Sequence, residues 1–191
     1  ASTVLSVIIG TLCALGLYKF EFKLKNMISS SLYIPIVIPE LVFAIALLIF
    51  FSSIHVSMSM VTLIIAHVTF SMPFVVITVR ARLAGFDKSI EEAARDLGAN
   101  ELRTFLRVTL PMISPGVISG GMLALTMSLD DVVVSFFTAG PESQTLPLKI
   151  LGMVRKGVSP DVNALSTLMI LGTIVILLTA TMIQGKLEKK L

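Results

Sequence analysis

Long apolar runs separated by short polar segments make up most of the chain. Within a few residues, they cover positions 2–17, 28–51, 57–79, 112–137 and 163–183. A helix needs about 20 mostly apolar residues to cross the hydrocarbon core of a bilayer. Only helices and closed barrels satisfy their backbone groups in lipid, and these runs are too long and too uniformly apolar for barrel strands. We therefore predict an all-α integral membrane protein, a single transmembrane domain over residues 1–191 with five transmembrane helices.

The positions of the basic residues indicate how these helices are oriented. Lysine and arginine gather in three connecting segments: Lys19, Lys23 and Lys25; Arg80, Arg82, Lys88, Arg95, Arg103 and Arg107; and Lys186, Lys189 and Lys190. By the positive-inside rule these segments are predicted to be cytoplasmic. The loop 138–162 is then outside, although it carries Lys149, Arg155 and Lys156. The net charge of +3 follows this topology and does not indicate a nucleic-acid surface.

The single cysteine and the two histidines do not form a metal-binding pattern. Cys13 lies inside an apolar run, which favours core packing over a disulfide or a metal site. His67 lies in the third run, where a packed, hydrogen-bonded histidine is favoured over a ligand, and His55 is expected in the turn after the second run. Gly116 and Gly120 form a G-x-x-x-G pattern that favours close helix packing. We expect neither a metal site nor catalytic residues.

The segment 89–111 is unusually polar for this chain and has strong helix signals. Ser89 and Glu92 fit a capping box at the start of a helix. One narrow apolar face is predicted at i, i+3, i+4 and i+7, formed by Ile90, Ala93, Ala94 and Leu97. Gly98 then stands where a helix C-terminus favours a positive φ. A helix with such a low-profile face can lie in a groove of a partner protein, although a plain surface connection is the alternative.

A second short helix is predicted after Gly98. Asn100 can cap its N-terminus, and Leu102, Phe105 and Leu106 give it an apolar side. Pro111 is expected to close the segment before the fourth apolar run.

The same segment resembles a known motif. Glu92-Ala93-Ala94, three residues, Gly98, nine residues, Val108, one residue and Leu110-Pro111 resemble the EAA motif of ABC importer permeases, E-A-A-x3-G-x9-I-x-L-P, with Val108 as the one departure. The resemblance implies that the loop of about residues 80–111 holds a coupling helix that docks on an ABC ATPase. The positions carried over to that role are Glu92, Ala93, Ala94, Gly98, Leu110 and Pro111.

Further strings resemble the permeases of polyamine importers for spermidine and putrescine. They lie at residues 72–76, at 128–135 (SLDDVVVS), at 146–150 (LPLKI) and at 157–167 (GVSPDVNALST). The family resemblance implies a type I permease core with six spans, so we expect that a first helix is missing before Ala1. It also implies a bacterial cytoplasmic (inner) membrane location, a second permease subunit, an extracytoplasmic binding protein and a dimer of ATPase subunits that holds ATP and Mg.

Three acidic residues in the apolar runs are candidates for a substrate pathway. Glu40 lies near the middle of the second run, after Pro35 and Pro39, which are expected to kink the helix. Asp130 and Asp131 lie towards the outer end of the fourth run, and adjacent helical residues point about 100° apart. No lysine or arginine lies deep in any run, which suits a cationic substrate. The alternatives are a subunit or helix-end contact for Glu40 and an outer cap or gate contact for the aspartates.

Other function classes remain as alternatives at this point. The chain has no G-x-x-x-x-G-K-[ST] loop, so ATP hydrolysis is assigned to a separate subunit and this chain is predicted not to be an enzyme. An importer permease for another small solute, such as an iron complex or thiamine, is the main rival, and an ion-coupled carrier is a more distant one. An intramembrane aspartyl protease is disfavoured because its two aspartates must converge from facing helices.

Overall fold

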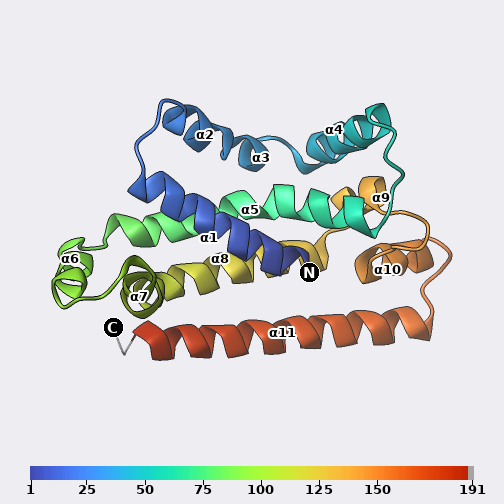
Figure 1. Cartoon of the computed structure of the whole chain (residues 1–191). Helices are drawn as coiled ribbons and strands as arrows, with labels where there is room; N and C mark the ends of the chain where they lie inside the picture. The colour runs from blue at the N-terminus through green and yellow to red at the C-terminus, as the bar shows by residue number, and fades with distance from the viewer. Residues whose placement is uncertain (189–191) are drawn as a thin grey trace.

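The computed structural model describes the backbone of residues 1–188 and the side chains of residues 1–185. Within that range every regular element is a helix. Three helices pack side by side in the middle of the molecule (Figure 1): α1 (Ser2–Lys19), α5 (Met60–Ala84) and α8 (Leu110–Asp130). The long helix α11 (Pro160–Glu188) lies along one side against α8, and the helices α2 to α4 lie on the opposite side.

The core lies where α1, α5 and α8 meet. Ala14, Val75, Val79, Ile113 and Ala124 are fully buried there. Small residues allow the backbones to approach closely. A Cβ atom built on Gly120 would lie 2.9 Å from the Cα of Val75, and one built on Gly116 would lie 2.9 Å from the Cβ of Arg82. The close packing predicted from the G-x-x-x-G pattern is confirmed, as is the packing of Cys13 against this core.

The predicted spans are found, with two breaks that the apolar pattern did not show. Among the described residues, four helices are long and apolar enough to cross a membrane, or five if a bent pair of helices is one span. The bent pair replaces the second predicted run, and the helix direction changes by 111° between its two parts. It consists of α2 (Lys25–Ser31) and α3 (Ile34–Val37), followed by α4 (Glu40–Ser53).

Proline explains the position of the bend. Pro39 has no backbone N–H, and its ring disfavours the helical conformation of the residue before it. Ile38 accordingly has φ −69° and ψ 133°, an extended conformation that ends α3. The kink predicted from Pro35 and Pro39 is confirmed, but the prediction of one helix over 28–51 is wrong.

The fourth predicted run also ends earlier than expected. Helix α8 stops at Asp130, and a separate short helix, α9 (Val133–Thr138), follows it. Asp131 between them is extended, with ψ 126°. The span predicted over 112–137 is therefore two helices.

At its other end, α8 is longer than predicted. The helix α7 (Glu101–Thr104) continues through a π turn, η1 (Phe105–Thr109), directly into α8, so the second short helix is not a separate element. Pro111 lies in the first turn of α8 and does not close the segment. The wider π turn relieves the clash of the proline ring with the preceding helical turn, since it changes the backbone pairing just before Pro111.

The ends of the helices gather in two groups. Figure 1 shows α6 (Ser89–Asp96) and α7 at one end of the molecule, together with the last residues of α1 and of α11. Helices α9 and α10 (Leu146–Val154) lie at the opposite end. The basic segments predicted to share one side of the membrane therefore gather at the same end, except that Lys189, Lys190 and the side chain of Lys186 lie outside the described residues.

Candidate functional site

Two of the three candidate pathway acids, Glu40 and Asp131, come together from distant parts of the chain. Glu40 is the first residue of α4, immediately after the bend, and it is half-buried. Its carboxyl group lies close to that of Asp131 and also interacts electrostatically with Asp130 and His67. Carboxylates this close repel each other when both are charged, so the site favours a cation between them. The bend at Pro39 is what brings Glu40 to the break between α8 and α9.

Asp131 is buried and fully engaged by residues of this chain. Its carboxylate accepts hydrogen bonds from the backbone N–H groups of Val134 (2.9 Å) and Ser135 (2.8 Å) and from the Ser135 hydroxyl (2.6 Å). His67 Nε2 lies 3.1 Å from Asp131 Oδ2. Asp131 therefore caps the N-terminus of α9, which is the alternative that the sequence left open for it.

His67 holds this cap from the middle of α5. It is buried, and its Nδ1 lies 3.0 Å from the Ser128 hydroxyl oxygen of α8. Its Nε2 lies 3.1 Å from the Ser135 hydroxyl oxygen of α9. The expectation of a packed, hydrogen-bonded histidine agrees with this arrangement. His67 thus joins α5, α8 and α9 at the break between α8 and α9.

Asp130 faces a different part of the molecule. It is exposed and lines a cavity of about 240 Å³ between α8 and α11, with Thr126 and Leu129 on one wall and Met169 and Thr173 on the other. The two neighbouring aspartates therefore have separate surroundings, as expected from the angle between adjacent helical residues. Asp130 is available to a ligand, whereas Asp131 is occupied.

The polar segment after α5 forms helix α6, but with a different cap from the one predicted. The Asp87 carboxylate accepts a hydrogen bond from the Ser89 backbone N–H at 2.9 Å, and α6 has no side-chain cap from Ser89. The predicted capping box of Ser89 and Glu92 is wrong, because an aspartate two residues earlier reaches the same free N–H group. This N–H group stabilises the charged carboxylate and lowers the pKa of Asp87 below its ordinary value.

The C-terminus of α6 forms as predicted. Gly98 has φ +84°, and its N–H bonds to the Arg95 carbonyl at 2.8 Å. The Ala99 N–H bonds to the Ala94 carbonyl at 3.1 Å, which completes a Schellman motif. Asn100 Oδ1 then accepts from the Arg103 N–H at 2.9 Å and caps α7, as predicted.

Most side chains of α6 remain uncovered in this chain. Ile90 is 39% exposed, Leu97 is 89% exposed, and Glu92 and Ala93 are also exposed, while Ala94 is half-buried. The predicted apolar face is thus free for a partner. Of the two remaining motif positions, Leu110 is half-buried and Pro111 is exposed at the start of α8.

One functional candidate of α6 was missed by the sequence reasoning. Glu91 is 7% exposed and accepts a hydrogen bond from the Thr109 hydroxyl, and Lys19 Nζ lies 3.5 Å from its Oε1. Nothing local in the sequence distinguishes it from the neighbouring Glu92, because its partners belong to other elements.

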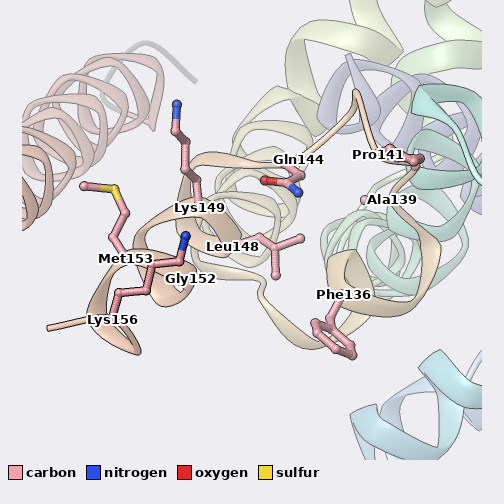
Figure 2. Close-up of a pocket in the computed structure, with 10 residues that line it drawn as sticks. Phe136, Ala139, Pro141, Gln144, Leu148, Lys149, Gly152, Met153 and Lys156 are labelled. Atoms are coloured by element: carbon pink, nitrogen blue, oxygen red, sulfur yellow. The ribbon is translucent and has the colours of Figure 1, made fainter.

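The loop 138–162 holds a basic hollow at the opposite end of the molecule from α6 (Figure 2). It has a volume of about 670 Å³ and lies between α9, the following loop and α10. Phe136 and Leu148 contribute apolar surface, while Lys149 and Lys156 contribute charge. The apolar residues Leu146, Leu148, Ile150 and Leu151 all belong to α10.

Comparison with known proteins assigns this architecture a family. Residues 6–191 match the family described as "Binding-protein-dependent transport system inner membrane component". The chain is 42% identical over 182 residues to the spermidine/putrescine transport system permease protein PotC of Escherichia coli (strain K12), covering 95% of this chain and 69% of that protein. It is 42% identical over 176 residues to the putrescine transport system permease protein PotI of the same strain, covering 88% of this chain and 62% of that protein.

Solved structures share the fold. A chain of the MetNI methionine ABC transporter, from a structure of its inward facing conformations, has a TM-score of 0.76 and 19% identity, covering 97% of this chain and 89% of that chain. An amino acid ABC transporter crystallised with histidines has a TM-score of 0.66 and 20% identity, covering 100% of this chain and 89% of that chain. At this level of identity the likeness concerns the fold alone.

Proposed function

Because this chain belongs to the family of inner membrane components of binding-protein-dependent transport systems, it is a multi-pass permease subunit of an ABC importer, and we propose that its substrates are the polyamines spermidine and putrescine. The observation that carries the substrate is the 42% identity, over 95% of this chain, to a spermidine/putrescine permease. The predicted type I permease fold is confirmed by the solved permeases with the same fold.

The acids near the bend support a cationic substrate. Glu40 and Asp130 come from different spans, and the ion pairs of the described residues include no lysine or arginine partner for either of them. A polyamine has ammonium groups separated by methylene stems, so carboxylates bind its charges while apolar walls cover the stems. Of the three candidates, we assign direct substrate contact to Glu40 and Asp130. We assign Asp131 to the wall that holds Glu40 and α9 in place.

The exposed face of α6 supports docking on an ATPase. We assign this contact to Glu92, Ala93 and Ala94, with Gly98 setting the end of the helix and Leu110 and Pro111 setting its connection to α8. ATP and Mg then bind to a separate dimer of ATPase subunits, and this chain carries no catalytic residue. Closure of that dimer shifts the balance between inward-facing and outward-facing states of the spans.

The remaining parts of the assembly follow from the same proposal. A second permease subunit completes the pore against the exposed apolar sides of the spans. An extracytoplasmic binding protein delivers the polyamine at the end that holds α9, α10 and the hollow with Lys149 and Lys156. The assembly lies in the bacterial inner membrane.

Uptake measurements test the proposal. The full-length permease is expressed with its ATPase, second permease and binding protein in cells that lack their own polyamine importers, and uptake of labelled spermidine and putrescine is followed. ATP-dependent uptake that competes with unlabelled polyamine is expected. An assembled complex that hydrolyses ATP but takes up neither polyamine would direct the assignment to another solute, such as an iron complex or thiamine.

A further inference from the structure

The attachment of α6 to the rest of the chain depends on one charged residue. Among the described residues of α6, Glu91 is the only buried one. The apolar side chains Ile90 and Leu97 point away from the bundle and are exposed. Hydrophobic burial therefore does not fasten this helix to the spans, although a docked ATPase would push on it.

Glu91 contacts two of the three core helices. The Thr109 hydroxyl, in the last residue of η1 before α8, donates a hydrogen bond to Glu91 Oε1. Lys19 Nζ, in the last residue of α1, lies 3.5 Å from the same oxygen. The carboxylate thus joins the ends of α1 and α8, which pack on each other and on α5 in the core.

Further charged contacts surround Glu91 and also hold α6 next to α7 and α1. Arg95 Nη2 lies 3.9 Å from Glu91 Oε2 on the same helix and 3.1 Å from Glu101 Oε1 at the start of α7. Lys88 Nζ, just before α6, lies 5.3 Å from the centre of the Tyr18 ring on α1. These surface pairs are individually weak, so the buried carboxylate is the central contact of the group.

The neighbouring glutamate, Glu92, points to a different side of the helix. Glu92 is exposed, whereas the Glu91 side chain is 9% exposed. Consecutive helical residues point about 100° apart, so one glutamate faces the bundle and the other faces the partner side. We propose that Glu91 is the positioning residue that transmits movement of the docked helix α6 to α1 and α8. This inference rests on the proposed ATPase docking of α6.

The contact of Glu91 with Thr109 lies at the π turn between α7 and α8. Single π turns inside α-helices are frequent at functional sites, because their backbone pairing differs from that of the helix around them. Thr109 closes the π turn and is bonded to Glu91, so displacement of α6 pulls on the point where α7 passes into α8. Without the contact between Glu91 and Thr109, α6 would be joined to α8 only through the loop 97–100 and α7. Such a connection would transmit a displacement of α6 poorly.

The first test compares transport with ATP hydrolysis. In the assembled full-length complex, Glu91→Gln and Thr109→Val are each expected to leave ATPase copurification and ATP hydrolysis in place but to lower spermidine uptake per ATP by about fivefold or more. The matched control is Glu21→Gln, which removes a charge from an exposed pair with Lys25 on the same side of the membrane. Uptake per ATP within about twofold of wild type in both variants overturns the proposal.

A second measurement does not depend on the substrate. Spin labels are placed at Asp96→Cys on α6 and Leu12→Cys on α1, both exposed positions, in a Cys13→Ser background. In the assembled complex, a narrow distance distribution is expected with Glu91 present and a broad one with Glu91→Gln. An unchanged distribution overturns the role of Glu91, whereas failure of wild-type polyamine uptake bears only on the proposed substrate. Copurification of the ATPase with the permease reports loss of docking separately.

Discussion

His67 Nε2 lies 3.1 Å from Asp131 Oδ2, and this contact joins the middle of α5 to the break between α8 and α9. Because Asp131 also caps α9 through the Val134 and Ser135 N–H groups, the pair holds the outer end of the bundle in one arrangement. The same carboxylate interacts with Glu40, so the structural clamp adjoins the proposed substrate pathway.

Removal of the clamp is expected to lower stability. His67→Ala leaves the buried Asp131 and Ser135 side chains without their ring partner, and a buried polar group that loses its partner costs about 1–3 kcal/mol. Thermal unfolding of the purified permease in detergent measures this loss. His55→Ala, in the exposed turn after α4, is the control and is expected to unfold like wild type. Equal unfolding temperatures of both variants would contradict the clamp.

Loss of the Glu40 charge is expected to weaken polyamine transport. Glu40→Gln keeps the size of the side chain but removes the charge proposed to bind an ammonium group, so the KM for spermidine is expected to rise about tenfold, equivalent to ~1.4 kcal/mol. Uptake kinetics in the assembled importer measure it. Glu142→Gln, in the exposed outer loop, is the matched control. A KM that stays the same in Glu40→Gln would remove Glu40 from the pathway.

Asp130→Asn separates the two adjacent aspartates. Asp130 lines an open cavity, whereas Asp131 is bonded to α9 and His67. Asp130→Asn is expected to raise the KM for spermidine while the unfolding temperature stays near that of wild type. Asp131→Asn replaces one acceptor oxygen by an NH2 group that cannot accept the bonds made there, and it is expected to lower the unfolding temperature, because a buried donor without its acceptor costs about 1–3 kcal/mol. The opposite pattern in the two measurements would reverse these assignments.

Changes on the exposed side of α6 are expected to act on the ATPase contact. Glu92→Lys reverses a charge at the proposed interface, and Gly98→Asp places a side chain at φ +84°, where residues other than glycine are strained by about 1–2 kcal/mol. Copurified ATPase and ATP-dependent uptake are both expected to fall. Glu142→Lys, a charge reversal at the other end of the molecule, controls for net charge. ATP-dependent uptake that is unchanged in both α6 variants would rule out docking through this helix.

The close approach of α5 and α8 gives a prediction for packing. Gly120→Ala places a Cβ 2.9 Å from the Val75 Cα, so backbone must shift, and overpacking of this kind costs about 1–3 kcal/mol. Thermal unfolding in detergent is expected to show this loss. Gly172→Ala on α11 is the control, since its Cβ would meet no atom within 4 Å. A Gly120→Ala protein as stable as the control would contradict the packing described above.

Several features of this protein are determined by short stretches of its sequence. The length of the apolar runs predicts α1, α5 and α11, because spanning a bilayer depends on the local number of apolar residues. Gly98 and Asn100 predict the turn between α6 and α7, because each acts on backbone groups within a few residues of itself. The motif from Glu92 to Pro111 and the strings that resemble polyamine permeases indicate the family, which the comparisons confirm.

Tertiary structure alone decided which polar residues meet. Hydropathy treats 28–51 and 112–137 as continuous runs, because it does not register the missing N–H group of Pro39 or the carboxylate of Asp131 that caps a new helix. The environment of Asp131 depends on His67, which belongs to another helix. Glu91 and Glu92 are the same residue type at adjacent positions, and only the packing of α6 against the ends of α1 and α8 buries one and exposes the other.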